Sequence, residues 1–170
     1  MTENIKIGVI SDTHDHRDNI LFFVNKFISE KVSAVFHCGD FVAPFVKNWF
    51  QGLKDANIPF YGVFGNNDGE REGLRQILGE ICNLKFDFFE KELFGKRFAM
   101  FHHLSPAMVE ALAKSGTYDV ILKGHTHQRQ NEIIGKTLVL NPGEGCGYLT
   151  GKASAAIINL NDLSVQFFEK

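Results

Sequence analysis

The sequence predicts an α/β fold, and three features of the 170-residue chain lead to this prediction. Apolar runs alternate with helical patterns through the first half, which is typical of parallel strands joined by right-handed crossovers. The second half holds paired strands with short glycine turns, so we expect the sheet to become mixed. Hydrophobic residues make up 44% of the chain and charged residues 22%, a balance that indicates a globular protein and excludes a disordered or fibrous one.

The first half is expected to hold three strands separated by two helices. The first apolar run lacks a polar alternation, which predicts a strand buried on both faces. The third strand has Pro59 near its start, where the missing N–H costs least. In chain order, these strands and helices are predicted at 5–10, 19–28, 34–37, 45–54 and 58–64.

The second half is expected to begin with a helix and to continue mainly as hairpins. Ser105 as N-cap, Pro106 at the first position and Gly116 just past the end predict a helix between them. The elements are a helix at 70–81, strands at 85–94 and 97–101 around Gly95-Lys96, a helix at 105–114, a strand at 118–122, and hairpins at 132–140 and 153–168. The chain has no internal repeat or flexible linker, so residues 1–170 are predicted to form a single domain.

Charge and cysteine content narrow the possible partners and compartment. The net charge of −2 argues against a broad basic face, so we expect no stable complex with nucleic acid, whereas a small phosphorylated ligand stays possible. Residues 1–4 lead into the first strand without a signal-peptide pattern, and no apolar run approaches membrane-spanning length; we expect a cytoplasmic protein with no membrane partner. Cys38, Cys82 and Cys146 form no C-x-x-C pair, which favours buried, reduced thiols.

Every predicted core strand ends in a side chain that can bind a metal ion. Because the carboxyl ends of parallel strands share one edge of a sheet, these side chains should converge there. Without a cation the carboxylates would repel one another and the imidazoles would lose solvation. The sequence therefore predicts two divalent ions at this edge. The seven candidate ligands are Asp12, His14, Asp40, Asn66, His102, His125 and His127.

The motifs SDTH, HCGDF, GNND, MFHH, KGHTH and NPGEGCGYLTG stand in the chain in this order. In order and spacing, the sequence resembles the calcineurin-like metallophosphoesterase superfamily, and most of all its small single-domain prokaryotic phosphodiesterases. The combination is specific, although each motif alone is weak. The resemblance implies a sandwich of two mixed β-sheets flanked by helices, with four layers in the order α/β/β/α.

The resemblance also implies a role for each candidate ligand. The first ion would be held by Asp12, His14 and His127, the second by Asn66, His102 and His125, and Asp40 would bridge the two. The carboxylate and imidazole donors suit Mn²⁺, our first expectation, and leave Ni²⁺, Co²⁺, Fe²⁺ and Zn²⁺ open. No organic cofactor is expected.

The reaction that the resemblance implies is the hydrolysis of phosphodiesters. Two ions about 3.5–4 Å apart would lower the pKa of a shared water, and the resulting hydroxide would attack in line with the leaving group. The expected catalytic residues are Asp40, Asn66 and His103. His103 follows the candidate ligand His102 where relatives commonly have glycine, and it is equally compatible with a solvated side chain or one that reaches the substrate.

The sequence departs from the usual pattern at two positions. Asn67 stands where many relatives have a histidine that can protonate the leaving oxygen, and an amide cannot do this. Glu144 stands where serine is frequent, and its carboxylate disfavours phosphate binding by the surrounding loop. Asp68 could orient a neighbouring histidine or cap the helix after it, and His37 is interpreted as a core or supporting histidine outside the site.

Two other functions stay open at this point. A phosphomonoesterase or nucleotide pyrophosphatase could use the same ions. A protein-binding scaffold, such as the retromer subunit that shares this fold, would use the surface and would not need seven converging donors. A homo-oligomer is possible, because Trp49 and some of the 17 Phe could form a subunit contact.

Overall fold

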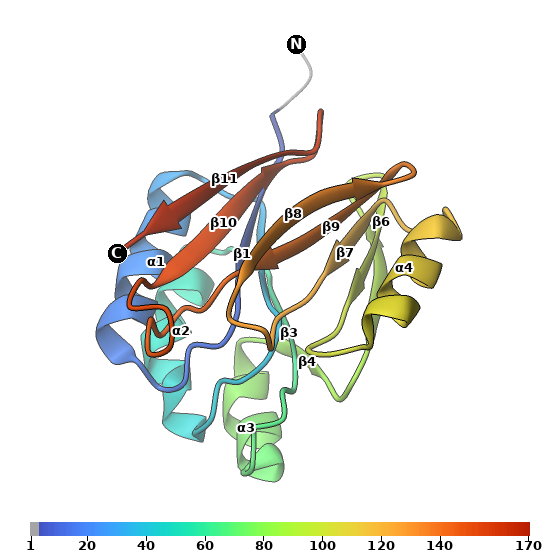
Figure 1. The fold of residues 1–170 in the computed structure, drawn as a ribbon. Helices are drawn as coiled ribbons and strands as arrows, with labels where there is room; N and C mark the ends of the chain where they lie inside the picture. The colour runs from blue at the N-terminus through green and yellow to red at the C-terminus, as the bar shows by residue number, and fades with distance from the viewer. Residues whose placement is uncertain (1–3) are drawn as a thin grey trace.

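The computed structural model of the protein describes residues 4–170 and contains two β-sheets that pack face to face between helices (Figure 1). The prediction that no signal peptide precedes the first strand was drawn from residues 1–4, and residues 1–3 lie outside the described range. Among the helices of residues 4–170, none combines the length and apolar character needed to cross a membrane.

The first sheet has six strands in the order β11-β10-β1-β2-β3-β4. Strands β1 to β4 are parallel, whereas β10 is antiparallel to β1, and β11 is antiparallel to β10. Their bounds are β1 Lys6–Ile10, β2 Ala34–His37, β3 Phe60–Val63, β4 Asn83–Lys85, β10 Ser154–Asn159 and β11 Ser164–Glu169.

Both faces of β1 are buried from Ile7 to Ile10, as the apolar run there predicts. Ile7 and Val9 face the second sheet, while Ile10 packs under the helices. On that helix-facing side, a Cβ on Gly8 would lie 2.7 Å from the ring of Phe27. The strand therefore has no solvent-facing side on which polar residues could alternate.

The second sheet has five strands in the order β5-β6-β7-β9-β8. Strands β6, β7 and β9 are parallel to one another, and β5 and β8 are antiparallel to their neighbours. Their bounds are β5 Phe89–Leu93, β6 Lys96–Met100, β7 Val120–Leu122, β8 Arg129–Ile134 and β9 Thr137–Pro142.

Helices cover the outer face of each sheet (Figure 1). Helices α1 (Arg17–Ser29), α2 (Lys47–Asp55) and α3 (Arg71–Ile77) pack on the first sheet, and α4 (Pro106–Lys114) packs on the second. A third apolar core fills the space between the sheets. The fold class is confirmed: two mixed sheets form a sandwich in an α/β/β/α order.

The predicted strand at 85–94 is wrong in its extent, because the chain crosses from one sheet to the other within it. β4 joins β3 in the first sheet, and β5 pairs with β6 in the second. The sequence pattern of residues 85–94 does not reveal such a crossing, because strand composition does not identify the sheet that a strand joins. The helices predicted at 45–54 and 70–81 each include a short 3₁₀ segment, η1 at Pro44–Val46 and η2 at Leu78–Glu80.

Candidate metal centre

The seven candidate ligands follow the carboxyl ends of parallel strands in both sheets. Asp12 and His14 follow β1, Asp40 follows β2, and Asn66 follows β3. In the second sheet, His102 follows β6, and the pair His125 and His127 follows β7. Because the two sheets present these ends at the same edge of the sandwich, donors from distant parts of the chain meet there.

The ligands predicted for the first ion lie side by side. Nε2 of His127 is 3.4 Å from Oδ1 of Asp12, and the rings of His14 and His127 stack with centroids 5.3 Å apart. Nε2 of His14 lies 3.5 Å from Oδ2 of Asp40. The sulfur of Cys146 is within 4.8 Å of ring nitrogens of both histidines, a proximity that the sequence did not predict.

The ligands predicted for the second ion meet at the Asn66 side chain. Its Oδ1 is 2.9 Å from Nε2 of His102 and 2.8 Å from Nδ1 of His125. Nε2 of His102 is also 3.4 Å from Oδ2 of Asp40. The same Asp40 oxygen thus faces a histidine from each predicted set, as a bridging carboxylate requires.

Two atoms of the site are buried without a hydrogen-bond partner among the described residues, and these are Oδ1 of Asp12 and Nε2 of His14. Burial raises the pKa of Asp12 above its ordinary value, because removal from water penalises the charged form. An unpaired buried polar atom is costly, and a cation between these donors would satisfy both. The oxygen and nitrogen donors present here therefore fit divalent metal ions.

Asp40 stays ionised in spite of its burial. Burial alone would raise its pKa, but hydrogen bonding and charge from His102, together with hydrogen bonds from Asn67, hold the pKa well below the ordinary value. Asn67 donates its backbone N–H to Oδ1 at 2.8 Å and its side-chain amide to Oδ2 at 2.7 Å. The Asn67 side chain is thus directed at the carboxylate of Asp40.

Asp68 ties two of the ligand-bearing loops together. Its oxygens accept the backbone N–H groups of Gly65, Asp40 and Val42 at 2.7, 3.1 and 2.8 Å. The interpretation of Asp68 as a helix cap is wrong, because α3 begins after Glu70 and no side chain caps it. A carboxylate that accepts three backbone N–H groups holds the loops after β2 and β3 in register.

His37 also supports these loops, from the interior of the protein. It is completely buried, its Nδ1 accepts the Gly39 N–H at 3.1 Å, and its Nε2 lies 2.9 Å from Oγ1 of Thr13. Both ring nitrogens are therefore used in contacts to the loops after β1 and β2, in agreement with a supporting histidine outside the site.

The backbone at the site adopts an uncommon conformation. Five of the seven candidate ligands have a positive φ, and they are Asp12, His14, Asp40, His125 and His127, with values from 39° to 70°. Non-glycine residues rarely adopt this left-handed region, and such strain concentrates at functional sites. It persists only where surrounding contacts hold the backbone in place.

Two glycines make room for the ligands. A Cβ on Gly65 would lie 2.0 Å from Oδ1 of Asp40, and a Cβ on Gly124 would lie 2.0 Å from Oγ of Ser11 and 2.8 Å from Oδ2 of Asp12. No real Cβ tolerates such distances, so the glycines that precede Asn66 and His125 are required by the close approach of the neighbouring loops.

A hollow of about 230 Å³ adjoins the second set of ligands. Asn66, His102 and His125 line it, together with His103 and Arg71. His103 is exposed, and its ring centroid is 4.2 Å from that of His125. The hollow therefore opens directly beside the second set of ligands.

Arg71 is a residue that the sequence analysis missed. Its Nε donates to the carbonyl of Asp68 and its Nη2 to the carbonyl of Gly65, both at 3.2 Å. These two bonds hold the guanidinium in place and leave further N–H groups for a ligand. No signal in the sequence set Arg71 apart, because α1 and α2 also begin with a cation, Arg17 and Lys47.

Glu144 is the second residue whose role was missed. It is completely buried, and its Oε2 lies 2.6 Å from Nδ1 of His127. Burial would raise its pKa, but hydrogen bonds from His127, Thr150 and Leu149 hold it at about 2. The carboxylate therefore points into the protein, which removes the expected conflict with phosphate at the surface of this loop.

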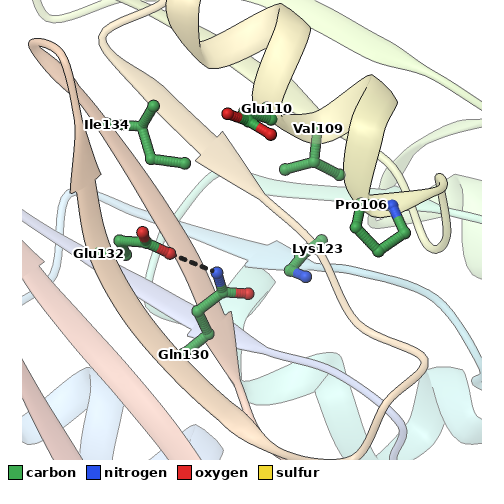
Figure 2. A pocket seen from close by; sticks show the side chains of 7 residues that line it. All are labelled: Pro106, Val109, Glu110, Lys123, Gln130, Glu132 and Ile134. Atoms are coloured by element: carbon green, nitrogen blue, oxygen red, sulfur yellow. Dashed lines mark hydrogen bonds between the residues drawn. The ribbon is translucent and has the colours of Figure 1, made fainter.

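A second hollow, of about 380 Å³, lies between α4 and the outer face of the second sheet (Figure 2). Lys123, Glu110 and the hydrogen-bonded pair Gln130 and Glu132 point toward it. Burial lowers the pKa of Lys123. None of the seven candidate ligands lines this hollow, so it is separate from the candidate metal centre.

Residues 5–163 match the calcineurin-like phosphoesterase superfamily domain, and the chain belongs to this superfamily. This family membership confirms the prediction of a phosphoesterase enzyme. Members of the family are metallophosphoesterases, which implies divalent metal ions, and the clustered donors of this chain are compatible with them.

Known proteins resemble the chain over nearly its whole length. Phosphodiesterase MJ0936 of Methanocaldococcus jannaschii is 45% identical over 157 residues, which cover 91% of this chain and 93% of the relative. A solved structure described as a novel archaeal phosphodiesterase superimposes with a TM-score of 0.90 at 40% identity, covering 98% of this chain and 100% of the other. A protein of Mycoplasma pneumoniae named "Probable metallophosphoesterase" is 32% identical over 147 residues, 81% of this chain and 77% of the relative.

Proposed function

We propose that the protein is a dinuclear metal-dependent phosphodiesterase. The observation that supports this most strongly is the position of Asp40, whose Oδ2 faces His14 at 3.5 Å and His102 at 3.4 Å. One carboxylate oxygen between two histidine-containing donor sets is the arrangement that a pair of bridged ions needs. The relative and the solved structure named as phosphodiesterases favour a diester substrate.

Each donor set would hold one ion. Asp12, His14 and His127 would bind the first and Asn66, His102 and His125 the second, with Asp40 shared. When bound, the two ions would polarise the phosphoryl oxygens and lower the pKa of water, so they would supply both the electrophilic activation of the ester and the hydroxide nucleophile. The donor types are compatible with Mn²⁺, our first expectation, and also with Ni²⁺, Co²⁺, Fe²⁺ or Zn²⁺.

Residues of the adjoining hollow would bind and orient the ester. The Arg71 guanidinium, held by two backbone carbonyls, can donate to a phosphate oxygen from a rigid position. Asn67 donates to Asp40 and has no proton for a leaving oxygen. The exposed imidazole of His103 is the group of this hollow that can supply one.

The substrate is proposed to be a small phosphate ester. The hollow of about 230 Å³ is at the small end of ligand sites, and the net charge of −2 gives no broad attraction for a polyanion. We propose a cytoplasmic protein that forms no stable complex with nucleic acid or membrane; assembly into a homo-oligomer stays a prediction.

The test measures the hydrolysis of phosphate esters after the metal is removed and again after metal is added back. Protein stripped with a chelator should be inactive, and Mn²⁺ should restore hydrolysis of bis(p-nitrophenyl) phosphate to a rate above that of p-nitrophenyl phosphate. Glu132→Gln, in the separate hollow of Figure 2, is the control that should keep full activity. Faster monoester hydrolysis would favour the monoesterase alternative. Stoichiometric metal with no hydrolysis of any ester, together with a tight protein partner, would favour a scaffold.

A further inference from the structure

We propose that Glu144 is a positioning residue that sets the tautomer and orientation of His127 for metal binding. The inference rests on the proposed role of His127 as a ligand. It concerns a position that departs from the usual superfamily pattern, in which serine is frequent. The sequence alone suggested an unfavourable carboxylate in a glycine-rich loop, whereas the structure turns this carboxylate inward.

The hydrogen bond between the two side chains has only one possible direction. An ionised carboxylate can only accept, so the Nδ1 of His127, at 2.6 Å from Oε2 of Glu144, must carry the proton. In a neutral ring the Nε2 then holds a free lone pair. This Nε2 is the atom that lies 3.4 Å from Oδ1 of Asp12, on the side where the first ion is proposed.

Glu144 is itself held by the loop that follows it. Its Oε1 accepts from the backbone N–H groups of Leu149 and Thr150 and from Oγ1 of Thr150, the last at 2.6 Å. The sulfur of Cys146 is 3.3 Å from Oε2. Every protein group around the carboxylate is thus a donor, and the side chain is completely buried. Such a site selects a carboxylate in one orientation.

Glutamine cannot replace this carboxylate without a conflict. If its amide oxygen accepts from Leu149 and Thr150, its NH₂ group faces Nδ1 of His127 and donates to it, which moves the ring proton to Nε2 and blocks the lone pair. If the amide is turned round, its NH₂ group faces the N–H and O–H groups of Leu149 and Thr150, so that donors oppose one another. Partners that orient a metal-binding histidine typically contribute 10- to 100-fold to metal affinity.

The experiment compares Glu144→Gln with two controls. Thr150→Val removes a hydroxyl that donates to Oε1 of Glu144 but leaves the bond between Oε2 and His127, so it tests a role limited to anchoring the loop. Glu110→Gln changes an exposed glutamate on α4. Each protein is examined without metal by long-range ¹H–¹⁵N NMR of the histidine rings at about pH 8, and then by calorimetric titration with Mn²⁺.

The expected NMR result is an Nδ1–H tautomer of His127 in the wild type and in both controls, and its loss in Glu144→Gln. The expected titration result is about 10- to 100-fold weaker binding of one Mn²⁺ in Glu144→Gln and a change below about 3-fold in the controls. Equal weakening in Thr150→Val would reduce Glu144 to a loop anchor and overturn the positioning role.

The wild-type spectrum keeps the proposal testable if Glu144→Gln fails to fold. An Nε2–H tautomer of His127 in metal-free wild-type protein would overturn the positioning role while leaving the proposed phosphodiesterase untouched. A wild type with the Nδ1–H tautomer that binds no Mn²⁺ would contradict the metal centre itself, and with it any role of Glu144 in metal binding.

Discussion

The substitution Gly65→Ala should damage the metal centre although it adds a single methyl group. The new Cβ would lie 2.0 Å from Oδ1 of Asp40, 2.5 Å from its backbone nitrogen and 2.7 Å from its Cγ. Ordinary van der Waals contacts of a Cβ begin at 3.4 Å, so Asp40 or its loop must move by roughly 1.4 Å to clear Oδ1. The neighbours are backbone and a short, buried side chain, and neither can move aside alone.

The size of the effect follows from the cost of overpacking a rigid interior. Such substitutions cost about 1–3 kcal/mol, and for a domain of this size 1 kcal/mol lowers Tm by about 2–4 °C. A loss of about 2 kcal/mol would therefore lower the Tm of metal-free protein by about 4–8 °C. Because Asp40 is displaced, the affinity for Mn²⁺ should also fall.

Gly69→Ala is the matched control for this experiment. Gly69 lies four residues further along the same connection, and a Cβ there would meet nothing within 4 Å, so its stability should stay within about 0.5 kcal/mol of wild type. Calorimetric unfolding of the metal-free proteins and titration with Mn²⁺ provide the two measurements. Wild-type Tm and wild-type Mn²⁺ affinity in Gly65→Ala would refute the close approach on which this reasoning depends.

Four further predictions concern the site and the stability of the fold. Asp40→Asn should bind less metal and lose most turnover while its circular dichroism stays native, because both ions lose a shared charge. His103→Ala should slow alkyl esters more than nitrophenyl esters, by part or all of a 10²- to 10⁴-fold general-acid effect, so that its rates fall more steeply with the pKa of the leaving alcohol than those of the wild type. Arg71→Lys should raise KM more than it lowers kcat, since it loses a rigid fork of donors, and equal kinetics in the two proteins would exclude phosphate contact. Hydrogen bonds from two lysines lower the pKa of Glu30. The contribution of Glu30 to stability is therefore present above the unfolded-state pKa of about 4.3 and is lost as pH falls through the folded-state value. In unfolding experiments, Glu30→Gln should make the free energy of unfolding depend less on pH in this acid range.

The part of the site that lies at strand ends could be predicted from the sequence. An apolar run that stops at Asp12, Asp40 or Asn66 identifies both the strand and the residue placed at its end. Since parallel strands align their ends, the linear order of these residues is enough to predict their convergence. The same reasoning found His102 and His125 in the second sheet without any knowledge of how the two sheets pack.

Contacts between loops could not be predicted in this way. Glu144 and His127 are separated by a complete hairpin, and whether the carboxylate points inward depends on donors supplied by residues 146–150. Asp68 binds the amides of a loop that precedes it by more than 20 residues, so a local helix cap was the simpler but wrong interpretation. The crossing between β4 and β5 also left no local mark, because strand composition does not identify the sheet that a strand joins.

The most direct test of the central claim is a titration of chelated protein with Mn²⁺, in which bound metal and hydrolysis of bis(p-nitrophenyl) phosphate are measured on the same samples. The number of bound ions per chain is measured by elemental mass spectrometry after free ions are removed. The account predicts two ions per wild-type chain, activity that becomes full only as the second ion binds, and fewer than two ions with little activity in Asp40→Asn. Full activity in metal-free protein, or two ions and near-normal turnover in Asp40→Asn, would contradict it.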